Sequence, residues 1–322
     1  MPVNLDKPHR WKDDVALSVD IYNEWFMAFA PVAFRTTRIR STEDVETALQ
    51  ATANLTNIQP AMLRNHPEFL PTLRMSTCPP LAVDRLIGLA GVSPSMVKRM
   101  EDERKLPVRM ATDEIDSELC KIGAVIEKMA DPDIFVWLGR SQPATAIEIN
   151  RAATIVADRL CGALANPIIR NAQEKRQLDR IRTWLVARGY RQLPGGEGTR
   201  FDAMAPGTFC FRLNVQVRQP GSARSINVPV DAVIMPIKSK LGDFPLLLEA
   251  KSAGDFTNTN KRRKEEATKL AQLRHTYNGM ATDRFNLFLC GYFNAGYLGY
   301  AAADGIDWVW EHRIDDLALF GL

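Results

Sequence analysis

Three polar residues interrupt two neighbouring apolar segments in the second half of the chain. Asp231 lies within VPVDAVIMP, and eighteen positions later the segment FPLLLEAK delivers Glu249 and Lys251 with one residue between them. Residues two apart on a strand point to the same side, so Glu249 and Lys251 share a face. Two carboxylates and a lysine on adjacent strands suit metal-assisted hydrolysis of a phosphodiester. That reaction needs acidic oxygens for Mg²⁺ and a cation near the attacking water.

The connection between the two segments, residues 236–243, is short and predicts an antiparallel hairpin that brings Asp231 beside Glu249. Two carboxylates held close together repel each other unless a divalent cation lies between them. We therefore expect Asp231 and Glu249 to be ligands of Mg²⁺, with the main-chain carbonyl of Ala250 as a further oxygen ligand. Lys251 is expected to orient the water or to stabilise negative charge in the transition state. In-line attack would leave a 5′-phosphate and a 3′-hydroxyl.

The E-x-K spacing alone is not specific, because Glu103 and Lys105 also fit it at an expected helix end. The position at Glu249 differs because it ends an apolar run, has an upstream Asp231 in a second such run, and precedes a basic helix. The alternative is an ion-paired strand end without activity, since acid clusters also occur in purely structural networks.

A basic segment, DFTNTNKRRK, follows the second strand directly and is a candidate for DNA contact. Asn and Arg make bidentate contacts with base edges, and a helix start beside positive charge suits a phosphate. The same Thr and Asn residues would also cap the following helix. The expected DNA-binding residues are Thr257, Asn258, Asn260, Lys261, Arg262, Arg263 and Lys264. A further basic run at residues 170–191 is either a DNA-contact surface or a solvated helix face.

Composition sets mild limits on the class of protein. The 322 residues are 46% hydrophobic and 25% charged, with a net charge of +3, as in ordinary globular proteins. The five cysteines form no CxxC pair and the four histidines are dispersed, so neither a zinc site nor a disulfide framework is expected. No signal peptide and no apolar run of about 20 residues is found, which predicts a cytoplasmic protein without a membrane segment.

The pattern of elements predicts an α/β protein in two parts. Residues 1–165 form a mostly helical region with a DNA-recognition or dimerisation role, and residues 166–322 form a mixed central sheet flanked by helices, which carries the chemistry. Thr42 predicts a helix start, and separate helices are expected over 144–164 and 168–190. The segments LAVDRLIGLAG and VSPSMVKRMED predict a helix pair that resembles a helix-turn-helix, with Leu86 and Leu89 packed against Met96, Val97 and Met100.

The pattern Asp231…Glu249-Ala250-Lys251 resembles the PD-(D/E)xK nuclease superfamily, with Val230 in place of the proline. Three longer segments, NLDKPHRW, LRMSTCPPLAVDRLIGLAGVS and EAKSAGDFTNTNKRRKEEA, resemble the XamI family of type II restriction endonucleases, and the resemblance spans nearly the whole chain. It implies a PD-(D/E)xK core and a Mg²⁺-dependent homodimer that cuts double-stranded DNA within a short palindrome. GTCGAC is the sequence associated with the family prototype. A cognate DNA methyltransferase in the same system is implied as well, because a site-specific nuclease kills an unprotected host.

The resemblance also implies a further metal ligand, Glu174, since a glutamate on the helix before the sheet completes the metal site in many such nucleases. The alternative is a surface glutamate that pairs with Arg170, four residues earlier on the same helix. Two other functions stay open at this stage: another nuclease on the same core, acting in repair or on DNA structures, and a non-enzymatic DNA-binding regulator built on the helix pair at 81–103.

Overall fold

The computed structural model describes residues 2–195, 198–219, 224–240, 242–257, 259–277, 279–281 and 283–322, and for residues 259–262 it describes the backbone alone. Contacts divide the chain into two compact units. The helical unit is Ala30–Ile169, and the sheet unit combines the chain up to Phe29 with Arg170–Leu322. The sequence placed a boundary near residue 165; in the structure the first 29 residues also belong with the sheet.

The helical unit has a core of its own. Buried side chains such as Leu73, Leu119 and Phe135 pack together in it. Its helices are α2 (Pro60–Asn65), α3 (Leu70–Met75), α4 (Val83–Ala90), α5 (Pro94–Glu103) and α6 (Thr112–Met129), with a 3-10 turn at Pro67–Phe69.

The expected helix pair is present as α4 and α5. Gly91 ends α4 in the left-handed conformation (φ 61°), which glycine adopts without strain, and the hydroxyl of Ser93 accepts from the amide of Met96 at the start of α5. Met96, Val97, Met100 and Leu86 are buried as expected, whereas Leu89 is half exposed, so its predicted packing role is wrong. Glu101 on α5 forms two 2.7 Å bonds with buried Arg74, which ties α5 to α3.

Two long helices, α1 (Pro8–Ala51) and α7 (Ala146–Val186), each run without a break through both units. The predicted helix start at Thr42 is therefore wrong, and so is the division of residues 144–190 into two helices. Pro31 and Pro167 lie inside these helices, each two residues from the last residue before a unit boundary. A proline removes one helix hydrogen bond, and the packing of the flanking turns in two separate cores outweighs that loss.

Helix α7 is long and apolar enough to cross a membrane by length and composition. Several of its apolar residues are core residues: Val156 and Leu160 are buried in the helical unit, and Ile181 and Leu185 in the sheet unit. That burial is typical of the core helix of a soluble protein.

The sheet unit contains a six-stranded mixed sheet in the order β1-β2-β3-β4-β5-β6, which confirms the predicted α/β class. Strand β1 runs parallel to β2, whereas β2 pairs with β3 and β3 with β4 in an antiparallel manner. Strands β4, β5 and β6 are parallel. The strands are β1 (Arg191–Gln192), β2 (Thr208–Arg218), β3 (Ser225–Met235), β4 (Leu246–Ala253), β5 (Phe285–Gly291) and β6 (Asp307–Trp310).

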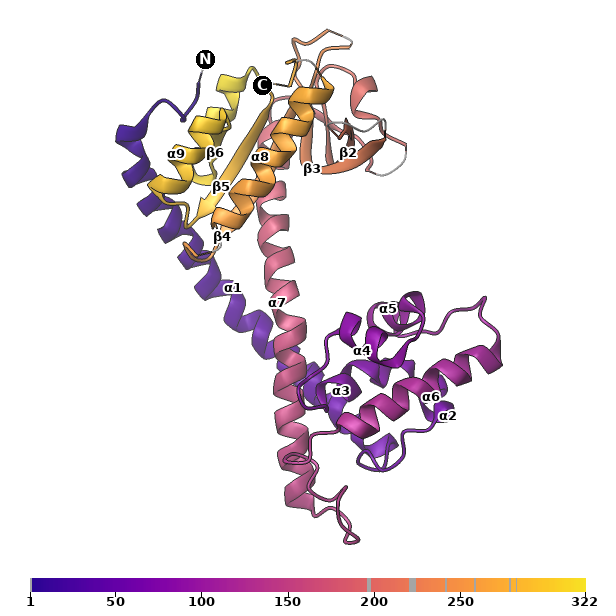
Figure 1. Ribbon diagram of the computed structural model, residues 1–322. Helices are drawn as coiled ribbons and strands as arrows, with labels where there is room; N and C mark the ends of the chain where they lie inside the picture. The colour runs from indigo at the N-terminus through magenta and orange to yellow at the C-terminus, as the bar shows by residue number, and fades with distance from the viewer. Residues whose placement is uncertain are drawn as a thin grey trace. The chain divides into compact units, whose positions relative to one another are not determined.

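Helices cover both faces of this sheet. On one face α7 packs through Ile181 and Leu185 against a cluster that includes Leu248. On the other face lie α8 (Thr259–Thr276) and α9 (Ala295–Asp304), whose Leu270 and Tyr297 share a cluster with the strands (Figure 1). Short 3-10 segments, Phe201–Ala203 and Glu311–Phe320, complete the unit. Helices thus pack on both sides of β4, which carries three of the predicted site residues, Glu249, Ala250 and Lys251.

Candidate active site

Strands β3 and β4 place Asp231 and Glu249 at matching positions. In the antiparallel ladder Ala232 lies opposite Leu248. Asp231 is the residue before Ala232 and Glu249 is the residue after Leu248, so the two acids are neighbours across the strands. The amide of Ala250 donates to Oδ2 of Asp231 over 2.8 Å. The predicted antiparallel pairing is therefore confirmed, and it brings the two carboxylates together at the end of the β3–β4 ladder.

Glu249 is nearly inaccessible to water, with 2% of its surface exposed. A buried carboxylate is costly unless it is paired, and two ammonium groups pair with this one. Lys251 Nζ lies 3.1 Å from Oε2 of Glu249, and Lys269 Nζ lies 2.6 Å from Oε1. Glu249 and Lys251 thus face the same side of β4, as the period of the strand predicts.

Lys269 is a residue that the sequence analysis missed. It lies on α8, and besides Glu249 it donates to the main-chain carbonyl of Pro229 over 2.8 Å. It therefore links α8 to both strands of the site. Its only sequence signal is its place in a basic helix, because the distance between a helix residue and a strand is set by packing and not by spacing along the chain.

Asp231 has a different electrostatic environment. Burial raises its pKa to about 6, and the neighbouring charge of Glu249 adds to this effect. Lys251 and the amide of Ala250 act in the opposite direction, and Glu174 adds a smaller upward contribution. For Lys251, burial lowers the pKa, but the carboxylates of Glu249 and Asp231 outweigh burial and raise it overall. Lys251 is therefore a permanent cation beside two acids.

A hollow of about 270 Å³ opens beside these groups, between α7, the strands and the start of α8. Gln177 closes one side of it and donates to the carbonyls of Phe288 (3.2 Å) and Lys251 (3.4 Å). The amide nitrogen of Gln173, which is buried, has no partner among the described residues. The hollow is lined by Arg170, Gln173, Glu174, Gln177, Asp231, Ala250, Lys251, Ser252 and Glu265.

The donor set fits a hard divalent cation. Within the described part of the chain, no three His, Cys, Asp or Glu side chains gather as a metal cluster, and Asp231 and Glu249 form a pair of neighbouring carboxylates. Mg²⁺ binds in this way, through one or two carboxylates with water in the remaining positions. Asp231, Glu249 and the carbonyl of Ala250 supply only oxygen.

Glu174 lines the same hollow, but it is bonded to a residue that the sequence did not indicate. Arg212 donates to Oε1 of Glu174 through Nε (3.0 Å) and Nη2 (2.8 Å). The expected alternative partner was Arg170. Arg212 lies in β2 with φ 52°, a left-handed conformation that is strained for any residue with a side chain and that often marks a functional site.

The predicted DNA-contact segment is described in part. Oδ1 of Asp255 accepts from the amide of Thr257 over 2.7 Å and from its hydroxyl, and α8 begins at Thr259. The segment therefore leads directly into α8, and the expected capping by its Thr and Asn side chains stays a prediction. Asn258 lies outside the described residues, and so do the side chains of Asn260, Lys261 and Arg262.

The last two residues of that segment differ from each other. The guanidinium carbon of Arg263 lies 4.0 Å from the centre of the Tyr300 ring, so this charge packs on the protein. Lys264 is exposed. Of the two, Lys264 is the one that is open to a phosphate.

The basic run on α7 is largely neutralised within the protein. Arg176 and Arg180 each lie 2.9 Å from the buried carboxylate of Glu311. Arg182 and Arg188 pair with Asp179 and Asp315. The pair of Arg182 lies within α7. Arg176, Arg180 and, just beyond the end of α7, Arg188 pair with acids of the C-terminal segment.

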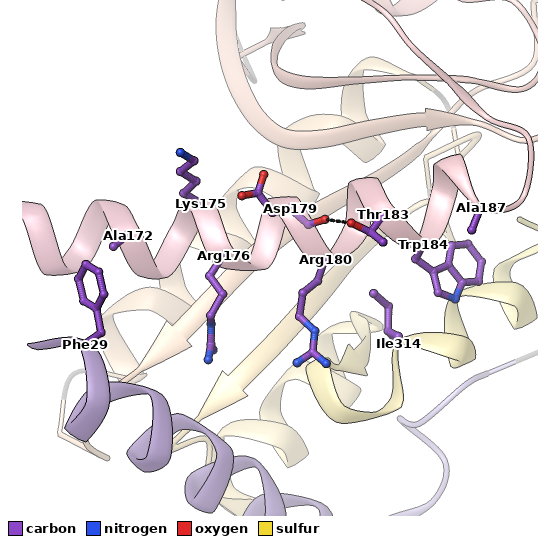
Figure 2. Close-up of a pocket in the computed structure, with 10 residues that line it drawn as sticks. All are labelled: Phe29, Ala172, Lys175, Arg176, Asp179, Arg180, Thr183, Trp184, Ala187 and Ile314. Carbon is purple, nitrogen blue, oxygen red and sulfur yellow. Dashed lines mark hydrogen bonds between the residues drawn. The ribbon is translucent and has the colours of Figure 1, made fainter.

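A hollow of about 760 Å³ lies over this paired face of α7 (Figure 2). Thr183 there donates to the main-chain oxygen of Asp179 over 2.9 Å. The guanidinium groups of Arg176 and Arg180, which also line this hollow, pair with Glu311. This hollow does not contain the two acids and the lysine, which lie on β3 and β4. We therefore place the candidate active site at β3 and β4.

A mixed sheet between helices, with an aspartate on one strand and Glu-x-Lys on its neighbour, defines a PD-(D/E)xK nuclease core. The sequence profile of the XamI restriction endonuclease family matches residues 53–310, and the chain belongs to that family. The chain is also 54% identical over 319 residues to the "Type II restriction enzyme SalI" of Streptomyces albus G, covering 99% of each chain. No solved structure matches it.

Proposed function

We propose that this protein is a type II restriction endonuclease that hydrolyses double-stranded DNA within a short palindrome and requires Mg²⁺. One observation carries the proposal: in a chain of the XamI family, strands β3 and β4 gather Asp231, Glu249 and Lys251 at one point. GTCGAC is the candidate recognition sequence that the resemblance implies. The products are a 5′-phosphate and a 3′-hydroxyl.

Asp231, Glu249 and the carbonyl of Ala250 would hold the Mg²⁺, which when bound polarises the scissile phosphate and lowers the pKa of a coordinated water. Lys251 adjoins Glu249 and would orient the attacking water or stabilise charge on the phosphate. Glu174 is a further ligand candidate at the mouth of the same hollow. On taking up that role it would release Arg212 for a DNA phosphate.

The wider proposal concerns partners. A palindrome has twofold symmetry, so a homodimer places one site on each strand. The helix start at Thr257 to Lys264 contacts phosphates, and the helical unit contributes to recognition or to dimerisation. The enzyme acts in the cytoplasm, beside a cognate DNA methyltransferase that protects the host.

The purified chain, incubated with linear phage DNA and Mg²⁺, is expected to produce discrete fragments whose sequenced ends share one palindrome. A smear of fragments, or a requirement for branched DNA, would instead favour a repair or structure-specific nuclease. Sequence-specific binding without cleavage in Mg²⁺, Mn²⁺ or Co²⁺ would favour a regulator.

Single substitutions Asp231→Ala, Glu249→Ala and Lys251→Ala are each expected to lower the cleavage rate by at least about 100-fold, because each removes a ligand or a charge from the reacting phosphate. Asp283→Ala, an exposed acid of the same unit, is the control and keeps the wild-type rate. Thermal melting confirms that the variants fold. Near-normal Mg²⁺-dependent cutting by Glu249→Ala would show that the site is assigned wrongly.

A further inference from the structure

The far half of the β2–β3 hairpin presents a polar face. Beyond Arg212, buried Leu213, Val215 and Val217 alternate along β2 with exposed Asn214 and Gln216. Strand β3 repeats the pattern, with exposed Asn227 and Pro229 alternating with buried Val228 and Val230. Because alternate residues share a face, one side of this two-stranded ribbon packs on the core and the other carries amide side chains.

The left-handed backbone of Arg212 sets which face is polar. Regular alternation would put Phe211 and Leu213 on the same side of β2. They instead pack in different cores, Phe211 on the α7 side and Leu213 on the α8 side. The change of face at Arg212 therefore turns Asn214 and Gln216 outward, away from the α8 core.

The outward amides line a groove of about 350 Å³. Gln216 lies directly opposite Asn227 in the antiparallel ladder, and Asn214 lies opposite Pro229. Within the described part of the chain, the side-chain amides of Asn214, Gln216 and Asn227 make no hydrogen bond. Each therefore has donors and an acceptor available to a ligand. The groove is lined by Thr199, Arg200, Phe201, Asp202, Arg212, Leu213, Asn214, Gln216 and Asn227.

The polar face leads directly into the active site. Asn227 and Pro229 lie four and two residues before Asp231 on β3, so the amides lie on the strand that carries the proposed metal-binding aspartate. At about 3.3 Å per residue, the amides lie roughly 7–13 Å along the strand from Asp231. Successive base pairs are about 3.4 Å apart, so this span is roughly two to four base pairs from the phosphate that is cut. That distance falls within one half of a short palindrome.

The opposite side of the ribbon is held by α8. The hydroxyl of Tyr277 donates to the carbonyl of Gln216, and the amide of Arg218 donates to the hydroxyl of Thr276 over 2.8 Å. A recognition element must be rigid to discriminate between bases, and these bonds fix the backbone beneath the amides.

We propose that the β2–β3 ribbon enters the major groove of the DNA and that Asn214, Gln216 and Asn227 read base edges next to the cut. The inference rests on the proposed function and deepens it, because it assigns the sequence specificity of the same site. A two-stranded antiparallel ribbon fits the major groove, and Asn and Gln side chains bind the N6 and N7 edge of adenine in a bidentate way.

The test compares Asn214→Ala, Gln216→Ala and Asn227→Ala with Gln192→Ala, an exposed amide on β1, which pairs with the opposite end of β2. Each enzyme digests phage DNA of known sequence, and all fragment ends are sequenced. The rate is also measured on a 30-base-pair duplex with the wild-type site and on duplexes that differ from it by one base pair. Thermal melting checks the fold of each variant.

At least one ribbon variant is expected to lose about 5- to 150-fold in kcat/KM on the wild-type duplex. On duplexes altered at one symmetric position, the kcat/KM of that variant should fall much less. The variant should therefore also cut phage DNA at altered sites, which produces new fragment ends. Gln192→Ala should cut as the wild type does. Equal rates and identical ends for all three ribbon variants would overturn the inference, and so would an equal loss on every duplex, which indicates phosphate contact. If the wild type itself yields no discrete ends, the proposed function fails instead.

Discussion

At the scale of single residues, the two acids of the site are stabilised unequally. Glu249 is buried and receives two ammonium groups, Lys251 and Lys269, whereas Asp231 receives one backbone amide. The cationic charge is therefore concentrated on Glu249. Burial of Asp231, and to a smaller extent the charge of Glu249, raise the pKa of Asp231 to about 6.

This imbalance predicts a pH-dependent stability. Because the pKa of Asp231 is raised in the folded state, its ionisation destabilises the fold above about pH 6, and the penalty is absent below about pH 4. Asp231→Asn is neutral and keeps an oxygen for the amide of Ala250. In metal-free buffer at pH 8 it should be more stable than the wild type by up to about 3 kcal/mol, and the gain should vanish at pH 4.

Urea unfolding at pH 4, 6 and 8, with EDTA, measures this difference, and Asp283→Asn serves as an exposed control. At pH 8, Mg²⁺ should stabilise the wild type and not Asp231→Asn. Parallel pH profiles for the wild type and Asp231→Asn would contradict the assignment of the raised pKa.

At the scale of elements, the N-terminal segment completes the sheet unit. The carboxylate of Asp307, at the start of β6, accepts from the backbone amides of Val3, Asn4 and Leu5 and from its own neighbour Trp308. Residues about 300 positions apart in sequence are thus joined by one buried side chain. The segment that precedes α1 is in this way anchored to the edge strand of the sheet.

Removal of that carboxylate should detach the N-terminal segment. Asp307→Ala leaves several amides without an acceptor, at a cost of about 1–3 kcal/mol for each one that stays buried. We expect a lower urea midpoint and faster proteolysis before Trp11, whereas Asp13→Ala, an exposed acid on α1, should change neither. Unchanged proteolysis in Asp307→Ala would show that the other contacts of the segment suffice.

At the scale of the whole molecule, the chain is divided into two units, and each unit has hydrophobic cores of its own. The core of the helical unit contains Leu119, and the cores of the sheet unit contain Leu287. Both side chains are fully buried. The active site and the proposed recognition ribbon both lie in the sheet unit, so its core alone determines their geometry.

The division predicts independent responses to core substitutions. Leu119→Ala and Leu287→Ala should each cost about 2–5 kcal/mol. In hydrogen exchange, Leu119→Ala should expose amides of α2 and α6 and leave β4 and β5 protected, and Leu287→Ala should show the reverse. Equal loss of protection in both units for either variant would mean that the chain unfolds as one cooperative body.

The sequence by itself determined the local geometry of the site. Apolar runs bounded by turn residues predicted β3 and β4, the short connection predicted their antiparallel pairing, and the period of two placed Glu249 and Lys251 on one face. These features follow from neighbouring residues, because backbone conformation and side-chain direction along a strand are local properties.

Only the tertiary structure decided which distant groups meet there. Lys269 reaches Glu249 because α8 packs on the sheet. Glu174 binds Arg212 and not Arg170, because the left-handed backbone at Arg212 changes the face of the sheet to which the side chains of β2 point. The sequence predicted a helix start at Thr42 and two helices over residues 144–190, yet α1 and α7 each continue through these positions, with Pro31 and Pro167 inside them. Such outcomes depend on the total burial of many side chains, which outweighs the preference of any one residue.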